Sequence, residues 1–297
     1  MRFSVVIITF NDRAKLLECL HALQAQSFPG DRFEIIVVDD GSTDGTADSV
    51  RSQFPRVRLV QKENSGPDNS RTLGVSLAIG EFVVFIDSDC LVAPDWLDNI
   101  DRSLERNKVS IVGGPIRHSG NFWVRLIGIS DFGEFQAATP NEACSIPSCN
   151  LAIRRELLAD CPFHPWVRMG GDVLVCYELR RRGHKILYDP TAVVVHRPRG
   201  DWQSFVRRAR VYGEGFVLLR LIDPTLRHSW ILKGGLLGVI LGTVGRAAMD
   251  WYRLFRFWKP AGFHLFELPP AAFLILLKRV ISVPPAVGAY RNRARIR

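Results

Sequence analysis

The chain has 297 residues, of which 47% are hydrophobic and 23% are charged. These proportions exclude a disordered or low-complexity chain, and the length suffices for one large domain or two ordinary ones with a buried core. Lys and Arg outnumber Asp and Glu by 39 to 30, a net charge of +9, which favours an anionic partner such as a phosphorylated substrate, a nucleic acid or an acidic membrane face.

The N-terminal segment MRFSVVIITF contains one charge, and its apolar run ends at Asn11 without a small-residue cleavage pattern. We therefore expect no signal peptide and a cytoplasmic catalytic part. The six cysteines are scattered, so we expect reduced thiols. A zinc site built from Cys144, Cys149, Cys161 and His164 is the less favoured alternative, because their spacing matches no common zinc finger.

Strand and helix patterns alternate four times in the first hundred residues. The expected strands are 3–10, 33–40, 56–61 and 81–86, and the expected helices are 12–26, 41–54, 66–80 and 93–106. We expect Asn11 and Thr43 to cap the first two helices with their side chains, and Pro67 to begin the third. This alternation predicts an open, mostly parallel α/β sheet with right-handed crossovers.

Acidic and other polar residues follow three of these strands, at 9–12, 39–42 and 87–89. Ligands of such sheets bind outside the carboxyl ends of the strands, so these residues are expected to meet there. Converging carboxylates repel one another unless a cation lies between them, and Mg²⁺ or Mn²⁺ prefers oxygen ligands. Neither common glycine-rich phosphate loop follows the first strand. We therefore expect metal and basic side chains to neutralise any bound phosphates.

Four motifs in succession, VVIITFND, IIVVDDGSTDGT, NSGPDNSRTLGV and FIDSDC, resemble those of the family 2 glycosyltransferases. These are inverting enzymes of the GT-A fold that use nucleotide-diphospho-sugars, and the resemblance covers roughly the first two-thirds of the chain. It implies a nucleotide-sugar site formed by Thr9, Asn11, Asp39, Asp40, Arg71, Asp87 and Ser88. It also implies a Mn²⁺ or Mg²⁺ site formed by Asp89, Asp87 and His196.

The segment SIPSCNLAIRREL resembles the start of the family's acceptor side, with Asn150 and Arg154 at its polar positions. The segment that begins MGGDVLVCYELRRRG resembles the region after the family's Glu-Asp motif, but Gly171 stands where Glu is common. Only Asp172 matches the acid, and we expect it to be the general base. Its alternative role is to stabilise the N-terminus of the following helix.

Arg207 and Arg210 are three residues apart on an expected helix and therefore share a face. That face is expected to bind the leaving diphosphate or the acceptor, or else to be a solvated basic surface. Processive relatives carry a Q-x-x-R-W motif nearby, which RRARV does not reproduce, so transfer of a single sugar is expected.

The C-terminal region combines apolar segments at 230–245 and 263–277 with arginines and aromatic residues. The uncharged run between Lys233 and Arg246 is 12 residues, shorter than the roughly 20 of a spanning helix. Pro269 and Pro270 interrupt the second segment. Helices lying in a membrane surface are therefore expected rather than two spans. A helical hairpin packed on the catalytic domain, a dimer interface and one marginal span are the alternatives.

We accordingly expect an α/β fold of the GT-A type with a C-terminal helical extension, divided into a nucleotide-sugar half (1–115), an acceptor half (116–225) and a membrane-associated region (226–297). The expected function is transfer of one sugar, with inversion, from a UDP-sugar to a lipid-linked or saccharide acceptor at the cytoplasmic face of the membrane. A catalytically silent nucleotide-sugar-binding scaffold and a nucleotidyltransferase are the rival functions. Nucleic acid is not an expected partner, since the basic residues form no recognisable binding module.

Overall fold

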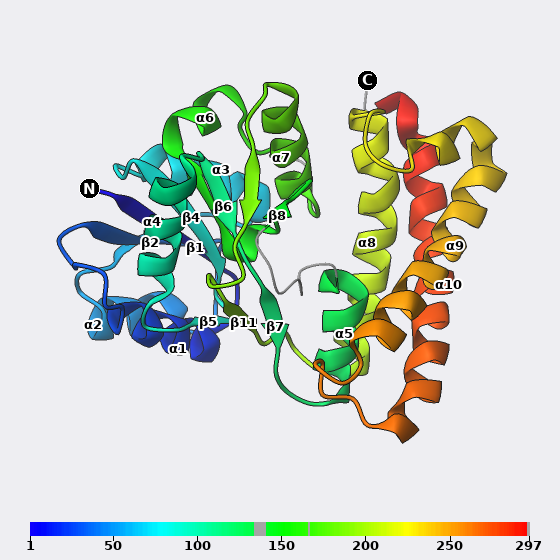
Figure 1. Ribbon diagram of the computed structural model, residues 1–297, viewed down its shortest axis with the longest axis horizontal. Helices are drawn as coiled ribbons and strands as arrows, with labels where there is room; N and C mark the ends of the chain where they lie inside the picture. Colours follow the sequence, from blue (N-terminus) through cyan, green and yellow to red (C-terminus); the bar gives the residue numbers. More distant parts are fainter. Residues whose placement is uncertain (134–140, 166, 296–297) are drawn as a thin grey trace. The chain divides into compact units, whose positions relative to one another are not determined.

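The structure is a computed structural model that describes residues 1–133, 141–165 and 167–295 (Figure 1). The chain forms two compact units. The first, which we call the sheet unit, comprises Met1–Arg117 and Phe135–His196. The second, the helical unit, comprises His118–Glu134 and Arg197–Arg297. These boundaries differ from the three segments expected from the sequence, whose assignment to donor, acceptor and membrane stays a prediction.

The sheet unit confirms the alternation of strands and helices. Its elements are β1 (Phe3–Thr9), α1 (Arg13–Gln24), β2 (Phe33–Asp39), α2 (Thr46–Gln53), β3 (Arg58–Gln61), α3 (Pro67–Leu77), β4 (Phe82–Asp87), β5 (Cys90–Val92), α4 (Trp96–Asn107), β6 (Ile111–Gly113), β7 (Ile116–His118), β8 (Asn141–Glu142), η1 (Ser148–Asn150), β9 (Leu151–Arg154), α6 (Arg155–Asp160), α7 (Gly171–Arg181), β10 (Ile186–Tyr188) and β11 (Val194–His196).

The strands form two sheets. The larger has the order β3-β2-β1-β4-β9-β6-β10-β8, and the smaller has the order β5-β11-β7. Strands β1 to β4 are mutually parallel, as expected, whereas β9 runs antiparallel between β4 and β6. The antiparallel β9 directly precedes α6 and lies beside β4, so the second half of the sequence completes the same sheet that the first half begins.

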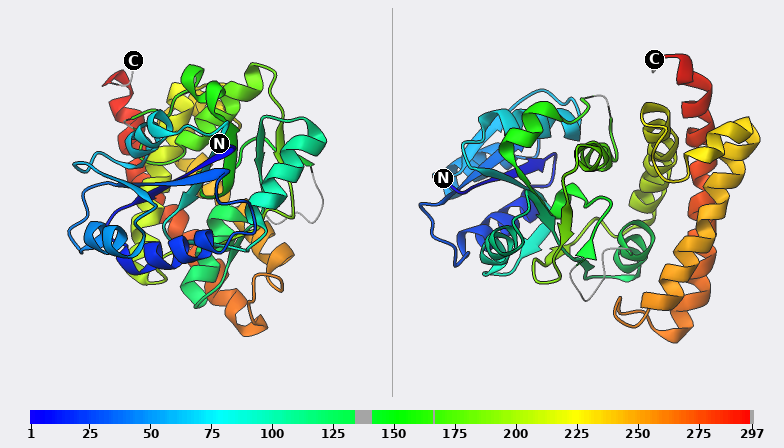
Figure 2. Two further views of the ribbon diagram at one scale, coloured as in Figure 1. Left: turned by 90° about the vertical axis from the view of Figure 1, so that its left-hand side faces the viewer. Right: turned by 45° about the horizontal axis from the view of Figure 1, so that its top comes forward.

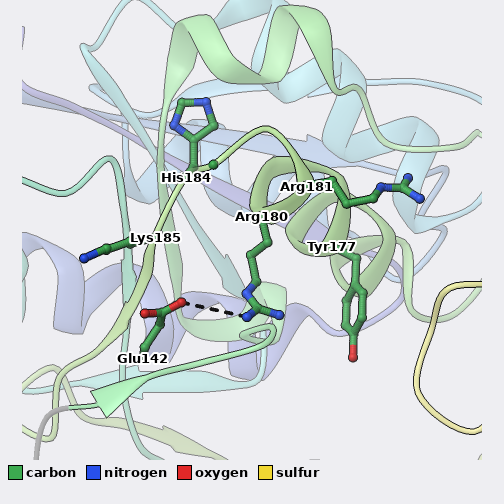
Figure 3. Close-up of a pocket in the computed structure, with 7 residues that line it drawn as sticks. Glu142, Tyr177, Arg180, Arg181, His184 and Lys185 are labelled. Carbon is green, nitrogen blue, oxygen red and sulfur yellow. Dashed lines mark ion pairs between the residues drawn. The ribbon is translucent and has the colours of Figure 1, made fainter.

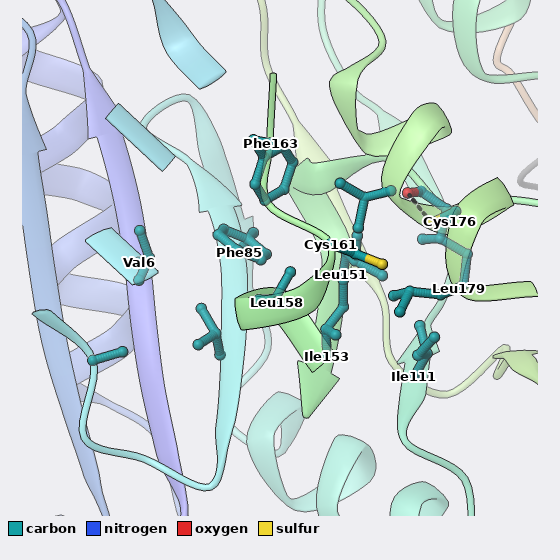
Figure 4. Close-up of a cluster of buried hydrophobic side chains, with 14 of the residues drawn as sticks. Val6, Phe85, Ile111, Leu151, Ile153, Leu158, Cys161, Phe163, Cys176 and Leu179 are labelled. Atoms are coloured by element: carbon teal, nitrogen blue, oxygen red, sulfur yellow. Dashed lines mark hydrogen bonds between the residues drawn. The ribbon is translucent and has the colours of Figure 1, made fainter. Parts of the chain in front are cut away.

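Both faces of the central strands are covered, which explains their continuous apolar sequences. Helices α1 and α2 lie on one face, and α3 and α7 lie on the other (Figures 1 and 2). On the second face Val6 and Phe85 pack with residues of α6 and α7, including Leu158 and Leu179 (Figure 4). Phe163 packs edge-on against Phe85, with ring centroids 5.2 Å apart, so this core extends to the edge of the sheet where β4 ends.

Two of the expected helix caps are wrong. Helix α1 has Asp12 at its N-cap and helix α2 has Gly45, and neither cap makes a side-chain hydrogen bond. Asn11 instead accepts from the backbone N–H of Thr43, at 2.8 Å, because the turn after β2 offers N–H groups with no helical partner. The expectation for α3 is confirmed, since Pro67 is its first residue.

The helical unit consists of α5 (Phe122–Phe132), α8 (Trp202–Ile222), η2 (Ser229–Gly234), α9 (Gly235–Phe257), η3 (Leu265–Glu267), α10 (Leu268–Arg291) and η4 (Asn292–Arg295). Helix α10 packs along both α8 and α9. The approach of α8 to α10 is close, because a Cβ atom on Gly213 would lie 2.3 Å from the carbonyl oxygen of Ser282. The unit is thus a packed helical bundle with its own apolar core.

Buried ion pairs cross-link this bundle. Lys278, which is fully buried, bonds to Asp131, and Arg208 donates to the same carboxylate at 3.0 Å. Arg279 is also buried and donates through Nε to Asp250 at 2.7 Å. Burial alone would raise the pKa of Asp131, but Lys278 and Arg208 hold it well below its usual range. These acids are therefore neutralised within the unit.

Two helical segments, Ser229–Phe257 and Leu265–Ala294, are long and apolar enough to cross a membrane by length and composition. Helix α9 has 23 residues and so extends well beyond the 12-residue uncharged run, while the expected position of these helices in a membrane surface stays a prediction. Pro269 and Pro270 do not interrupt the second helix, because they lie in its first turn, where no N–H partner is needed. Core helices of soluble proteins meet the same criteria, although only 22% and 33% of these two windows are buried.

Candidate active site

The carboxyl ends of β1, β2 and β4 meet, as predicted. Thr9 lies level with Asp39 in the β1–β2 register, and Ile8 lies level with Asp87 in the β1–β4 register. The hydroxyl of Thr9 is buried and has no hydrogen-bond partner among the residues that the structure describes. An unpaired buried hydroxyl is costly, so this edge is suited to a ligand that supplies the missing partner.

The acids after β2 have different environments. Asp39 accepts from the backbone N–H of Ser42 at 2.9 Å and faces the amide of Gln61 at 3.4 Å. Asp40 bonds to Lys62 and accepts from the backbone N–H groups of Ser65 and Gly66, both at 3.0 Å. Asp40 therefore fixes the loop before α3.

A second group of acids lies where β5 pairs with β11. His196 is the register partner of Cys90 in this antiparallel pair. As a result His196 Nε2 lies 3.3 Å from Asp89 Oδ1. Ser88, one residue before, donates to the carboxylate of Asp12 at 3.3 Å. The loop between β4 and β5 thus presents Asp89 to a histidine that lies 107 positions further along the chain.

Asp89, Cys90 and His196 have donor atoms within 4.8 Å of one another, the only such group of three or more acids, cysteines and histidines in the described part of the chain. A carboxylate and an imidazole suit Mn²⁺, and the carboxylate also suits Mg²⁺. The third donor is the thiol of Cys90, and hard divalent ions prefer carboxylate oxygen to sulfur. The residues present therefore fit a divalent ion held by Asp89 and His196.

Arg71 is the cation at the centre of the acids. It donates to Asp68 at 2.8 Å and to Asp87 at 3.4 Å, and its guanidinium lies 5.8 Å from the ring centroid of Phe163. Asp172 adds a third negative charge that, with Asp87 and Asp68, raises the pKa of Arg71 against the opposing effect of burial. Arg71 is thereby held among acids that come from α3, the end of β4 and the first turn of α7.

The two carboxyl groups next to Arg71, those of Asp68 and Asp87, both have a raised pKa. Loss of solvent raises the pKa of Asp87; Arg71 opposes this shift and the charge of Asp89 adds to it. Burial likewise raises the pKa of Asp68 to about 6, against the effect of Arg71 and with a further contribution from Asp172. A bound cation would relieve the repulsion between Asp87 and Asp89.

Asp172 lies in the first turn of α7 and is half-buried. One carboxylate oxygen accepts from the backbone N–H of Ser148 at 2.8 Å, and the other accepts from Val173 at 2.9 Å. Both of its predicted roles are therefore compatible: it stabilises the start of α7, and it holds an oriented carboxylate near Arg71.

The surroundings of three further predicted positions differ. Asn150 is fully buried, and its amide is paired with Trp96 and with the backbone oxygens of Pro115 and Ala192. We therefore assign it a structural role instead of the predicted contact with diphosphate or acceptor. Arg207 and Arg210 are exposed on α8, in the helical unit, and line a shared surface hollow. Their predicted role in binding diphosphate or acceptor stays a prediction.

The thiols are all free, as expected, and within the described ranges the cysteines of the alternative zinc set do not gather. A basic surface hollow of about 400 Å³ lies at the C-terminal end of α7, opposite to Asp172 (Figure 3). Its side chains include Arg180, His184 and Lys185, and Arg180 faces Glu142 at 3.8 Å. This hollow belongs to the outer surface of the sheet unit and is separate from the acids at the strand ends.

Sequence reasoning missed Asp68. It occupies the second position of α3 and is 1% exposed. Its spacing of three residues from Arg71 was a signal for an ion pair on one helix face. Its other neighbour, the backbone of Gly171, is far away in the chain and leaves no such signal.

Comparison with known proteins agrees with this geometry. Residues 4–161, more than half of the chain, match the model of the family described as "Glycosyl transferase family 2". Glycosyltransferase AglE of Haloferax volcanii is 26% identical over 247 residues, which span 78% of this chain and 80% of that protein. Poly(ribitol-phosphate) beta-N-acetylglucosaminyltransferase TarS of Staphylococcus aureus is 29% identical over 52% of this chain but only 26% of its own length.

Solved structures show the same fold. Mannosyltransferase PcManGT of Pyrobaculum calidifontis, solved with GDP-Man and Mn²⁺, matches 97% of this chain and 86% of its own with a TM-score of 0.62 and 24% identity. TarS 1–349 of Staphylococcus aureus in complex with UDP-GlcNAc matches 99% of this chain and 92% of its own with a TM-score of 0.59 and 18% identity.

Proposed function

Because this chain belongs to glycosyl transferase family 2 and is a glycosyltransferase of the GT-A fold, we propose that it transfers a single sugar from a nucleotide-diphospho-sugar to an acceptor hydroxyl with inversion. The donor is proposed to be a UDP-sugar. The observation that carries the proposal is the set of charges around Arg71, where Asp68, Asp87 and Asp172 act on one guanidinium at the carboxyl ends of the strands.

The donor half of the reaction is assigned to the residues at the ends of β1 and β2 and to α3. Thr9 and Asp39 are to hold the nucleoside, with the unpaired Thr9 hydroxyl and the Asp39 carboxylate as polar contacts. Asn11 and Asp40 keep the adjoining loops in place through their backbone contacts. Arg71 then faces the nucleotide with a fixed positive charge.

Asp89 and His196 would hold a divalent ion, and Asp87 and Ser88 directly precede Asp89 in the chain. When bound there, Mn²⁺ or Mg²⁺ supplies positive charge that stabilises the leaving nucleoside diphosphate. Mn²⁺ is the first candidate, because an imidazole is one of the two ligands. Titration of the free protein with each ion, followed by the change in the His196 imidazole NMR signals, tests this assignment without a turnover assay.

Asp172 is assigned as the general base. Its carboxylate is oriented by the N–H of Ser148, so that it can take the proton of an acceptor hydroxyl as that hydroxyl attacks the anomeric carbon. The oxygen–carbon bond to the acceptor forms while the bond to the diphosphate breaks, and the proton remains on Asp172. Attack on the face opposite the leaving group inverts the anomeric configuration.

Nucleotide binding tests the donor assignment. UDP, GDP, dTDP and CDP are each titrated calorimetrically with Mn²⁺, with Mg²⁺ or with EDTA, and Asp89→Ala is compared with the wild type. We expect UDP to bind in the presence of the ion, to weaken in EDTA and to weaken again in Asp89→Ala. Binding of GDP instead of UDP would change the proposed donor to a GDP-sugar. GDP is included because the similar structure of PcManGT was solved with GDP-Man. Binding of none of the four would overturn the proposal.

The proposed acceptor is a lipid-linked glycan at the cytoplasmic face of a membrane. It is supported by the two long apolar helical segments and by large apolar side chains exposed on them, including Leu237, Leu241, Phe255, Phe266 and Phe273. Basic side chains such as Arg256 lie on the same segments and suit lipid phosphates. A soluble saccharide is the alternative acceptor.

Flotation with lipid vesicles tests the membrane assignment. We expect the full chain to float with vesicles that contain anionic lipid, and the variant Leu237→Ser with Phe266→Ser to float less. A matched control, Ile79→Ser, removes an exposed apolar side chain from the sheet unit. Equal recovery of the wild type with and without vesicles would overturn this part of the proposal.

A further inference from the structure

Gly171, the first residue of α7, has no room for a side chain. A Cβ atom at this position would lie 1.7 Å from Asp68 Oδ2 and 2.5 Å from Asp68 Cγ, far inside van der Waals contact. Its backbone does not require glycine, because the positive φ of this turn, +88°, belongs to Gly170. Glycine is therefore required at residue 171 because the carboxyl group of Asp68 occupies the adjoining space.

Asp68 cannot easily leave that space. Its side chain is 1% exposed, and Oδ1 is held by Arg71 at 2.8 Å. Oδ2 has no hydrogen-bond partner among the described residues. An acid buried in this way is a cost to stability that a purely structural residue would not require. Its position therefore points to a role in the reaction.

The charges that face Asp68 are those of the proposed active site. Arg71 lies on the same helix, and Asp172 approaches from α7. Arg71 in turn contacts Asp87 at the end of β4. Asp68 consequently touches both Arg71, on the proposed donor side, and the turn that carries the proposed base.

We propose that Asp68 is a positioning residue of the transfer reaction, which fixes Arg71 for the donor and places a carboxyl group against the start of α7 beside Asp172. The inference rests on the proposed function and adds to it a residue that acts through Arg71. A carboxylate on residue 171 would enter the space that the Asp68 carboxyl group fills, but from the backbone of α7. Residues 68 and 171 therefore cannot both carry an acidic side chain in this space. Removal of the acid from residue 68 makes room for an acid at residue 171.

The test is a set of four proteins: wild type, Asp68→Asn, Asp68→Ala and the double variant Asp68→Ala with Gly171→Glu. Asn keeps the side-chain volume and an oxygen for Arg71 but removes the charge, whereas Ala removes the volume, the oxygen and the charge. We measure the Kd of UDP and of GDP with Mn²⁺, and kcat and KM for hydrolysis or transfer of the donor that binds, between pH 5 and pH 8.

We expect Asp68→Ala to raise the nucleotide Kd and the donor KM about 10-fold, as a misplaced binding group does. Asp68→Asn is expected to be intermediate and to change the pH profile, because the titrating carboxyl group is lost. The double variant is expected to bind nucleotide at least about 3-fold more tightly than Asp68→Ala, since residue 171 on α7 then supplies the acid. A folded double variant that is no better than Asp68→Ala, or single variants equal to the wild type, would overturn the inference.

The result separates this inference from the proposed function. Suppose that the wild type binds nucleotide and that Asp172→Asn abolishes turnover. If the Asp68 variants then equal the wild type, the inference about Asp68 is refuted and the proposed function stands. A wild type that binds no nucleotide removes both. Thermal stability gives the independent check on space: Gly171→Ala is expected to destabilise the wild type strongly and to be tolerated in the Asp68→Ala background.

Discussion

The two units differ in how their acids are paired with cations. In the helical unit the buried acids Asp131 and Asp250 are matched by buried cations, Lys278 and Arg279 among them. In the sheet unit the acids outnumber the nearby cations: Asp68, Asp87 and Asp172 share Arg71, and one oxygen of Asp68 is unpaired. Acids that each have a buried cationic partner need no further cation, whereas acids that outnumber the nearby cations leave free energy to be gained by binding one.

The largest effect is expected at Asp172, the proposed general base. Asp172→Asn removes the acceptor of the hydroxyl proton and is expected to lower kcat about 10²- to 10⁴-fold, while the Kd of the nucleotide remains unchanged. Turnover of the donor and calorimetric binding measure the two quantities.

Glu178→Gln is the matched control, because it changes an acid on the same helix whose partners, Arg181 and Arg182, lie on the surface. Full turnover in Asp172→Asn would favour a different base, and absence of turnover in the wild type would favour the silent scaffold.

The helical unit is expected to lose stability when its balance of charges is broken. Asp131→Asn leaves Lys278, which is fully buried, without its anionic partner and is expected to cost about 3–5 kcal/mol. Urea unfolding at pH 7 measures the loss. Replacing both partners, with Asp131→Leu and Lys278→Met, is expected to recover most of it, because no unpaired charge remains.

Nucleotide affinity of the folded Asp131→Asn protein is expected to be unchanged, because these charges belong to the helical unit. A loss of stability below 1 kcal/mol, the size of a surface pair, would contradict the contrast between the units.

The sheet unit is expected to gain stability when an unsaturated acid is neutralised. The pKa of Asp68 is raised to about 6 from 3.8, so its contribution to stability is full below pH 3.8 and is lost as the pH rises through 6. Asp68→Asn is therefore expected to be more stable than the wild type by about 1–3 kcal/mol at pH 7.5, with the difference closing towards pH 4.

Unfolding in urea at several pH values measures this difference. Asp48→Asn, at a carboxylate that is 89% exposed, is the control and is expected to change stability by less than about 0.5 kcal/mol. A pH-independent difference for Asp68→Asn would show that this acid is satisfied in the folded protein.

The smallest effect on stability is expected at α8. Arg207→Ala with Arg210→Ala changes two exposed side chains and is expected to alter stability by less than about 0.5 kcal/mol while raising the KM of donor or acceptor several-fold. Arg208→Ala is the control, because it removes a bond to the buried Asp131 and is expected to destabilise the unit. An unchanged KM in the double variant would favour the solvated basic face.

Much of the sheet unit was predictable because its signals are local. Continuous apolar runs identified β1, β2 and β4, and parallel strands place their carboxyl ends together, which predicted the meeting of Thr9, Asp39 and Asp87. The caps of α1 and α2 were predicted wrongly, since Asn11 is used by a turn 32 residues away. The surroundings of Asn150 were unpredictable for the same reason, because its partners come from three distant segments.

The α/β fold, the family and the acids at the strand ends could be predicted from the sequence, because the order of its motifs and the period of its apolar residues depend on neighbouring positions in the chain. Which charges are paired became known only from the folded structure. Lys278 reaches Asp131 across 147 positions, and the carboxyl group of Asp68 fills the space beside Gly171. Charge pairing and steric exclusion act over a few ångströms in space, and such proximity is produced only when distant segments pack together.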